Sequence, residues 1–150
     1  MTIRPARPAD ADRVAKLLTE LDYPTDAAAA RRRIESLSAR DSFTLLVAVN
    51  ERDQVVGLAG GQVILSVHSD EPVGLIMAMV VSPSERRHGT GRALVRAIED
   101  ALRSRGCTRV MVTSANRRAG AHAFYEAIGY ERTGLRFARR LDGDGRLPSA

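Results

Sequence analysis

The sequence predicts a single mixed α/β domain whose strands are concentrated in the middle of the chain. Apolar residues recur at helical spacing before residue 40 and again after residue 90, whereas strand-like apolar runs occupy residues 43–81. The chain has 150 residues, of which 44% are hydrophobic, enough to bury one core. We therefore expect one domain over residues 1–150, with the last eight or so residues forming a polar, flexible tail.

The first third of the chain predicts a short strand followed by two helices. A strand at residues 2–4 precedes a helix over residues 9–21, in which Val14, Leu17, Leu18 and Leu21 share one face. Tyr23-Pro24 ends that helix, because the residue before a proline avoids the helical conformation. Thr25 is then the expected N-cap of a second helix that reaches residue 39.

The middle of the chain predicts a hairpin and then a buried strand. Residues 43–50 and 55–65 have the pattern of two strands joined by a turn, which predicts a hairpin. Gly60-Gly61 predicts a bulge or a close backbone approach. After a polar loop at residues 66–72, residues 74–81 are so uniformly apolar that we expect both faces of this strand to be covered. It should therefore be a central strand of the sheet.

The last third predicts two helices and two strands. A helical stripe runs over residues 90–105, and Gly106 supplies the left-handed conformation that ends such a helix. A strand at residues 109–114, a helix at 117–128 and a final strand at 135–141 complete the expected order.

Composition limits the classes of partner. The net charge is +5, which suits nucleic acid, a membrane surface or an anionic cofactor. Only six residues are aromatic and acids separate the cations, so we expect no nucleic-acid partner, and the run Arg31 to Arg33 is expected to be a solvated helix face. With no apolar run of membrane-spanning length and a polar N-terminus, we expect no membrane partner and no secretory signal. Cys107, the single cysteine, fits packing in a reducing, cytoplasmic compartment.

The segment RRHGTGRA, residues 86–93, has the features of an anion site. It joins the end of the apolar strand to the start of a helix, where backbone N–H groups have no intrahelical partner and the helix dipole is positive. Gly89 and Gly91 allow a phosphate to approach the backbone, and Arg86, Arg87 and Arg92 add positive charge. The glycines alone could also simply form the turn. Neither a Walker loop nor a dinucleotide fingerprint fits this spacing.

Two segments carry a resemblance to a known family. VVSPSERRHGTGRALV resembles the central motif of the GNAT family of N-acetyltransferases, with Arg86, Gly89 and Gly91 in its signature positions. NRRAGAHAFYEAIGYERTG, residues 116–134, resembles the later motif of that family. The order of elements also agrees over residues 3–141. The resemblance implies a GNAT fold, in which a mixed, mostly antiparallel sheet is splayed at the strands before and after the cofactor turn and flanked by about four helices.

The resemblance also implies a cofactor and the residues that hold it. Acetyl-CoA is the expected co-substrate, and no metal is expected. Its pyrophosphate would lie on the turn, and its pantetheine arm on the backbone of the preceding strand. The implied cofactor-binding residues are Met79, Val80, Val81, Arg86, Arg87, His88, Gly89, Thr90, Gly91, Arg92, Asn116 and Phe124.

The roles of several residues stay open at this point. Tyr125 matches the tyrosine that donates a proton to the departing CoA thiolate, since a phenol is neutral at pH 7, although a packing role is the alternative. Asn116 is either a contact to the pantetheine arm or a helix N-cap. Phe124 belongs to the core or to a wall of the cofactor channel. His122 is either a surface residue or a ligand contact.

The general base is not evident. Many relatives carry a glutamate on the strand before the cofactor turn, whereas this strand reads LIMAMVV. Water or a loop residue is then the expected base. The loop before the strand contains three weak candidates for the base, His68, Asp70 and Glu71. The alternative is that they are simply solvated loop residues.

The expected function is acetyl transfer from acetyl-CoA to a primary amine of a small molecule. A protein N-terminal or lysine acetyltransferase is one alternative, and a non-catalytic acyl-CoA-binding regulatory module is another. Glu20, Asp22 and Asp26 near the junction of the first two helices leave a polycationic acceptor open. A homodimer through the strand at residues 135–141 is also expected.

Overall fold

The computed structural model describes residues 1–114 and 118–142. The chain divides into two compact units, Met1–Val112 and Thr113–Ala150, and each is described by itself. Among the described residues, no helix has the length and apolar character needed to cross a membrane. Whether the chain behaves as one domain stays a prediction.

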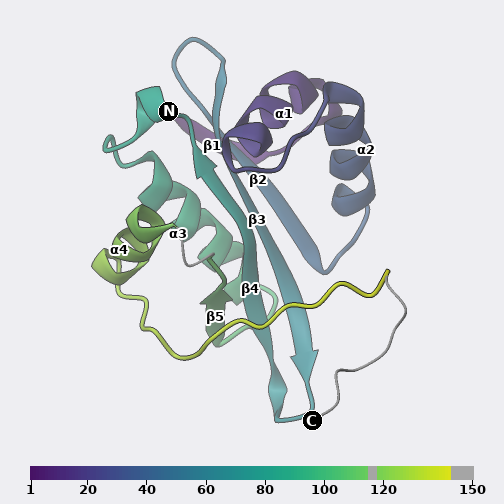
Figure 1. The fold of residues 1–150 in the computed structure, drawn as a ribbon, viewed down its shortest axis with the longest axis vertical. Helices are drawn as coiled ribbons and strands as arrows, with labels where there is room; N and C mark the ends of the chain where they lie inside the picture. Colours follow the sequence, from purple (N-terminus) through teal and green to yellow (C-terminus); the bar gives the residue numbers. More distant parts are fainter. Residues whose placement is uncertain (115–117, 143–150) are drawn as a thin grey trace. The chain divides into compact units, whose positions relative to one another are not determined.

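The first unit is built on a five-stranded sheet with the order β1-β2-β3-β4-β5 (Figure 1). Neighbours from β1 to β4 pair antiparallel, and β5 pairs parallel to β4, so the sheet is mixed and mostly antiparallel as predicted. The strands are β1 (Thr2–Pro5), β2 (Phe43–Val49), β3 (Val55–Ser66), β4 (Ser69–Val81) and β5 (Arg109–Val112).

Helices α1 (Ala11–Glu20) and α2 (Ala27–Ser38) cover one face of the sheet (Figure 1). Val14 and Leu17 of α1 and Ile34 of α2 are buried against Val47 and Leu58 of the sheet. Burial of such aliphatic side chains is the main term that holds the two helices in place.

The N-cap of α2 differs from the prediction. Asp26 accepts a hydrogen bond of 2.7 Å from the Ala29 N–H, so Asp26 and not Thr25 is the capping residue. The carboxylate caps the helix because it can accept from a free N–H while carrying negative charge at the positive end of the helix dipole. The Thr25 hydroxyl instead accepts a hydrogen bond of 3.0 Å from Arg33 NH1 and donates to the Tyr23 carbonyl at 2.7 Å.

Helix α3 (Thr90–Arg103) packs on the opposite face of the sheet and lies unusually close to it. Its buried residues Leu94, Ile98 and Leu102 each lie over a glycine of β3 or β4, respectively Gly57, Gly61 and Gly74. A Cβ atom at any of these glycines would come within 2.7 to 2.9 Å of the helix side chain above it. Because these glycines have no Cβ atoms, α3 can pack close to β3 and β4. This packing sets the position of the helix over the sheet.

The β3–β4 hairpin confirms one prediction and corrects two. The register shifts between Gly60 and Gly61, which is the predicted bulge. The expected polar loop at residues 66–72 is wrong, because β3 continues to Ser66 and β4 begins at Ser69. The polar residues are tolerated there because this end of the hairpin is exposed.

The expectation that both faces of residues 74–81 are covered is also wrong in part. Met77 is 55% exposed, because it borders an open cavity that is described below.

The second unit contains α4 (Ala119–Ala127). The strand expected at residues 135–141 is wrong, because no described strand pairs with this segment and its apolar side chains are not buried; Phe137 is 87% exposed. A homodimer can therefore not be argued from a strand here, and association of two copies stays a prediction.

Candidate active site

The turn between β4 and α3 has the backbone that its sequence predicts for an anion site. After β4 ends at Val81, one turn of 3-10 helix (Pro83–Glu85) leads to Arg87 and Gly89, whose φ angles are 65° and 83°. Gly89 is the N-cap of α3 and lies in the left-handed region that glycine adopts without strain. These two left-handed residues bend the chain between the 3-10 turn and the start of α3 at Thr90.

The start of α3 presents unpaired donors beside open space. The first intrahelical hydrogen bond runs from the Ala93 N–H to the Gly89 carbonyl at 3.0 Å, so the N–H groups of Thr90, Gly91 and Arg92 have no intrahelical acceptor. A Cβ built on Gly89 would meet nothing within 4 Å. The site therefore has room for an oxyanion against these N–H groups, and the residues present fit a pyrophosphate.

The side chains around the turn divide into exposed and buried ones. Arg86, Arg87, His88 and Arg92 are exposed, and Arg86 is directed back to the strand by a hydrogen bond of 3.1 Å from its Nε to the Val81 carbonyl. Thr90 is buried, so its side chain is not available to a ligand. The exposed arginines supply the positive charge that the sequence predicted.

The sheet is splayed next to this turn. β5 pairs with β4 only from Val73 to Ile76, while β4 continues to Val81. Beyond Ile76, the β5 side of β4 has no strand partner among the residues described. Met79, Val80 and Val81 lie on this stretch, and Val80 is buried in the core, so its side chain is not available to a ligand.

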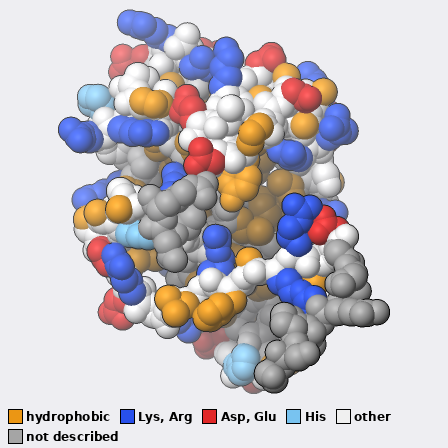
Figure 2. Space-filling view, viewed as in Figure 1, with side chains coloured by type: hydrophobic (Ala, Val, Ile, Leu, Met, Phe, Trp, Pro, Cys, Tyr) orange, Lys and Arg blue, Asp and Glu red, His pale blue; other side chains and the backbone are white. Residues whose placement is uncertain are grey.

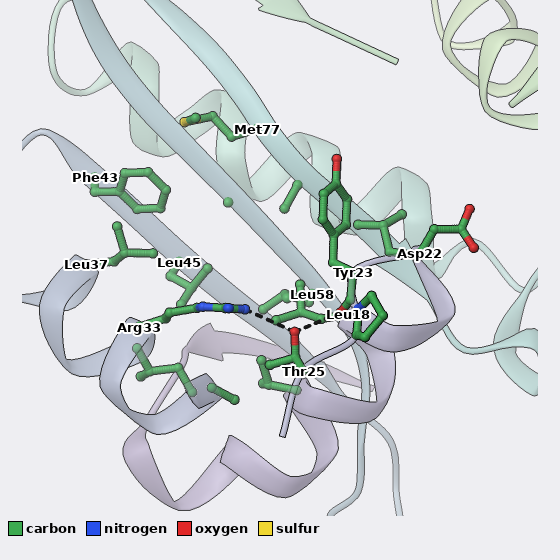
Figure 3. A pocket seen from close by; sticks show the side chains of 17 residues that line it. Leu18, Asp22, Tyr23, Thr25, Arg33, Leu37, Phe43, Leu45, Leu58 and Met77 are labelled. Carbon is green, nitrogen blue, oxygen red and sulfur yellow. Dashed lines mark hydrogen bonds between the residues drawn. The ribbon is translucent and has the colours of Figure 1, made fainter. Parts of the chain in front are cut away.

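A cavity of about 440 Å³ opens on the face of the sheet that carries α1 and α2. Its walls come from α2, the loop before it and strands β2 to β4 (Figure 3). Figure 2 shows it as a hollow with hydrophobic side chains on its floor. Met77 and Ala78, the first residues of the splayed part of β4, line it. The cavity and the anion turn thus share one strand.

Sequence reasoning missed most of this cavity. Of Glu20, Asp22 and Asp26, only Asp22 lines it. Arg33 is exposed, as expected for the charge run, and also lines the cavity. Ala30, Arg33, Ile34 and Leu37 are spaced i, i+3, i+4 and i+7, which is the spacing that could have placed Arg33 beside the apolar stripe of α2.

Tyr125 and Phe124 belong to α4 in the second unit. Tyr125 is 8% exposed, and its ring lies 5.3 Å from the ring of Phe124 and 5.5 Å from that of Tyr130, measured between centroids. Burial raises the pKa of the Tyr125 hydroxyl to about 12, and the charge of Arg118 opposes the rise. The hydroxyl is therefore fully protonated at neutral pH. Asn116 lies outside the described residues.

The weak candidates for the general base do not lie near the turn. Glu71 is ten residues before Val81 in the same strand, which is roughly 30 Å at the rise of a β-strand. Its carboxylate accepts a hydrogen bond of 2.7 Å from the Thr108 hydroxyl. His68, at the end of the same hairpin, is hydrogen-bonded through Nδ1 to the Ser66 hydroxyl at 2.9 Å. These residues, with Asp70 between them, lie at the end of the hairpin that is far from the turn.

Comparison with known proteins identifies a family. The profile of the acetyltransferase (GNAT) family matches residues 11–130. The chain is 30% identical over 135 residues to aminoglycoside N(6')-acetyltransferase type 1 of Stenotrophomonas maltophilia, covering 88% of this chain and 87% of that protein. It is 25% identical over 92 residues to the mycothiol acetyltransferase of Renibacterium salmoninarum, covering 61% of this chain but only 27% of that longer protein.

Solved structures share the fold. A GNAT family acetyltransferase from Staphylococcus aureus matches with a TM-score of 0.78 and 22% identity, covering 93% of this chain and 98% of that one. An aminoglycoside antibiotic 6'-N-acetyltransferase from Acinetobacter haemolyticus matches with a TM-score of 0.78 and 22% identity, covering 95% and 100%. At this identity the likeness concerns the fold alone.

Proposed function

Because this chain belongs to the GNAT family of acetyltransferases, and is thus an acyltransferase, we propose that it moves the acetyl group of acetyl-CoA to a primary amine of a small molecule. The observation that carries the proposal is the juxtaposition on β4 of an anion turn at one end of the splayed stretch and an apolar cavity at the other.

The anion turn is the proposed site of the cofactor's pyrophosphate. The N–H groups of Thr90, Gly91 and Arg92 would donate to its oxygens at the positive end of α3, with Arg86, Arg87 and His88 around them. The unpaired edge of β4 at Met79, Val80 and Val81 would take the extended pantetheine arm by backbone hydrogen bonds. Bound acetyl-CoA supplies an activated thioester. Asn116 and Phe124 remain proposed contacts to the arm and to the channel wall.

The cavity is the proposed site of the acceptor amine. The neutral amine attacks the thioester carbonyl carbon, so that a C–N bond forms and the C–S bond breaks. As the amide forms, the nitrogen keeps one proton and loses the other to solvent, because β4 carries no carboxylate near the splayed stretch to act as base. Tyr125 is the proposed donor of the proton that ends on the sulfur, and solvent then restores its hydroxyl proton.

A coupled assay of thiol release tests this function. The purified protein with acetyl-CoA should release free CoA thiol slowly alone and faster when small primary amines are added, with acetylated amine formed in equal amount. Acceleration by peptides but not by small amines would instead favour a protein acetyltransferase. Acetyl-CoA binding without acceleration by any amine would leave a non-catalytic binding module.

A further inference from the structure

The charges in the cavity narrow the class of acceptor. Resting on the proposed function, we infer that the acceptor is an amine on an apolar body of about the size of one ring, whose far end carries an anionic group that binds Arg33. This differs from the polycationic aminosugars for which the Stenotrophomonas maltophilia relative is named.

The walls of the cavity require an apolar body. They are formed mainly by aliphatic and aromatic side chains, among them Leu18, Leu37, Phe43, Leu45, Leu58 and Met77 (Figure 3). A ligand that placed hydroxyl or ammonium groups against these walls would lose hydration without gaining hydrogen bonds, which costs more than the contacts return. A volume of about 440 Å³ falls at the small end of ordinary ligand sites.

The Arg33 side chain makes one hydrogen bond within the described residues and has further donors that could bind an anion. Its NH1 donates to the Thr25 hydroxyl at 3.0 Å, and that hydroxyl in turn donates to the Tyr23 carbonyl at 2.7 Å. Within residues 1–114 and 118–142, this is the single hydrogen bond of the Arg33 side chain, and no carboxylate pairs with it. Arg33 is exposed, and its guanidinium keeps further donors that a ligand carboxylate or phosphate in the cavity could use.

Within the part of the chain that the structure describes, the one acidic residue of the cavity wall does not pair with Arg33. Asp22 is the only acidic residue that lines the cavity, and Figure 3 shows its carboxylate directed away from Phe43 and Met77. A polycation would therefore meet the positive charge of Arg33 with no carboxylate turned toward the apolar floor, and like charges repel. An acceptor with one amine and one anion suits this arrangement better.

The geometry also separates the two ends of the acceptor. Arg33 comes from α2, whereas Met77 and Ala78 come from the start of the splayed stretch of β4, and Figure 3 shows Arg33 and Met77 on opposite sides of the cavity. The anionic group would lie at α2 and the reacting amine at β4. The apolar body between them would span the cavity.

Three acceptors that share one reacting amine test this inference. 4-(Aminomethyl)benzoate, 4-methylbenzylamine and 1,4-bis(aminomethyl)benzene differ only in the group opposite the amine, which is negative, neutral or positive. We expect kcat/KM to fall in that order, with the carboxylate preferred about tenfold or more over the methyl group, as for one charge-assisted hydrogen bond. An aminoglycoside should be acetylated more slowly than the benzoate.

Arg33→Met removes the charge and keeps much of the side-chain volume. It should bring the ratio between benzoate and methyl acceptors to about one, while turnover of 4-methylbenzylamine and acetyl-CoA binding stay near the wild-type values. Arg32→Met is the matched control, because Arg32 is exposed on the same helix but does not line the cavity, and it should keep the ratio.

The outcomes separate this inference from the proposed function. If 4-methylbenzylamine is acetylated but the benzoate has no advantage, or if Arg33→Met leaves the ratio unchanged, the acceptor class is wrong and the enzyme stands. Faster acetylation of the diamine or of an aminoglycoside also overturns the acceptor class. If no amine accelerates thiol release, both proposals fail together.

Discussion

At the scale of single residues, the chemistry depends on how burial changes an ionisable group. Desolvation raises the pKa of Tyr125 to about 12, so its phenol is protonated throughout the neutral range. A phenol with this pKa is a weaker acid than free tyrosine. In the proposed reaction, its proton would therefore move toward the sulfur only as the C–S bond breaks and negative charge develops there.

Replacing Tyr125 by Phe tests this role. Tyr125→Phe should lower kcat about 100-fold, the scale of a lost general acid, while the Kd for acetyl-CoA stays unchanged because the ring is retained. Stopped assays and calorimetric titration measure the two quantities. Tyr23→Phe, which changes a residue of the cavity wall, should leave kcat near the wild-type value. Equal losses of turnover and cofactor affinity in Tyr125→Phe would show that the hydroxyl is structural.

At the scale of elements, α3 links the core to the cofactor turn. Leu94, Ile98 and Leu102 lie on glycines of the sheet, so the height of the helix above the sheet is set by missing Cβ atoms. Since the N–H groups proposed to bind the cofactor are the first of this same helix, its packing also determines where they lie.

Gly74→Ala should therefore disturb both stability and the cofactor site. The new Cβ would lie 2.7 Å from Leu102 Cδ1 and 3.3 Å from Leu102 Cβ, which cannot move without the helix. We expect a loss of about 1 to 3 kcal/mol in the free energy of unfolding, measured by urea denaturation. Gly60→Ala is the control, because its Cβ would meet side chains no closer than 3.5 Å. Equal stability of the two variants would contradict the close packing of α3.

At the scale of the whole chain, the sequence predicted the elements better than the surfaces between them. The helical stripes of α1 and α3 and the bulge at Gly60-Gly61 follow from local periodicity and glycine chemistry. The cavity does not, because it depends on which side chains of α2, β2 and β4 meet across the sheet. Arg33 shows the difference, since the charge run correctly predicted an exposed helix face but did not show that its last member also lines a cavity.

The end of the chain shows a second feature that local sequence patterns did not predict correctly. The alternation of Leu135 and Phe137 with polar neighbours is typical of a strand, but a strand also needs a partner for its backbone. The described chain supplies none to residues 131–142. Tyr125 and Asn116 were assigned by resemblance to a motif, so their roles stay proposals that kinetics must test.

The central claim is that the turn before α3 binds the phosphates of acetyl-CoA, and calorimetric titration with acetyl-CoA tests it most directly. The wild-type chain should bind with micromolar affinity, and Gly89→Leu should bind at least about tenfold more weakly, because the side chain fills the open space beside the first N–H groups of α3. Gly106→Leu is the matched control at the other end of α3, where a glycine also has a positive φ, of 86°, and it should keep the affinity. Circular dichroism confirms that both variants are folded. Wild-type affinity in Gly89→Leu, or no binding by the folded wild-type chain, would contradict the account.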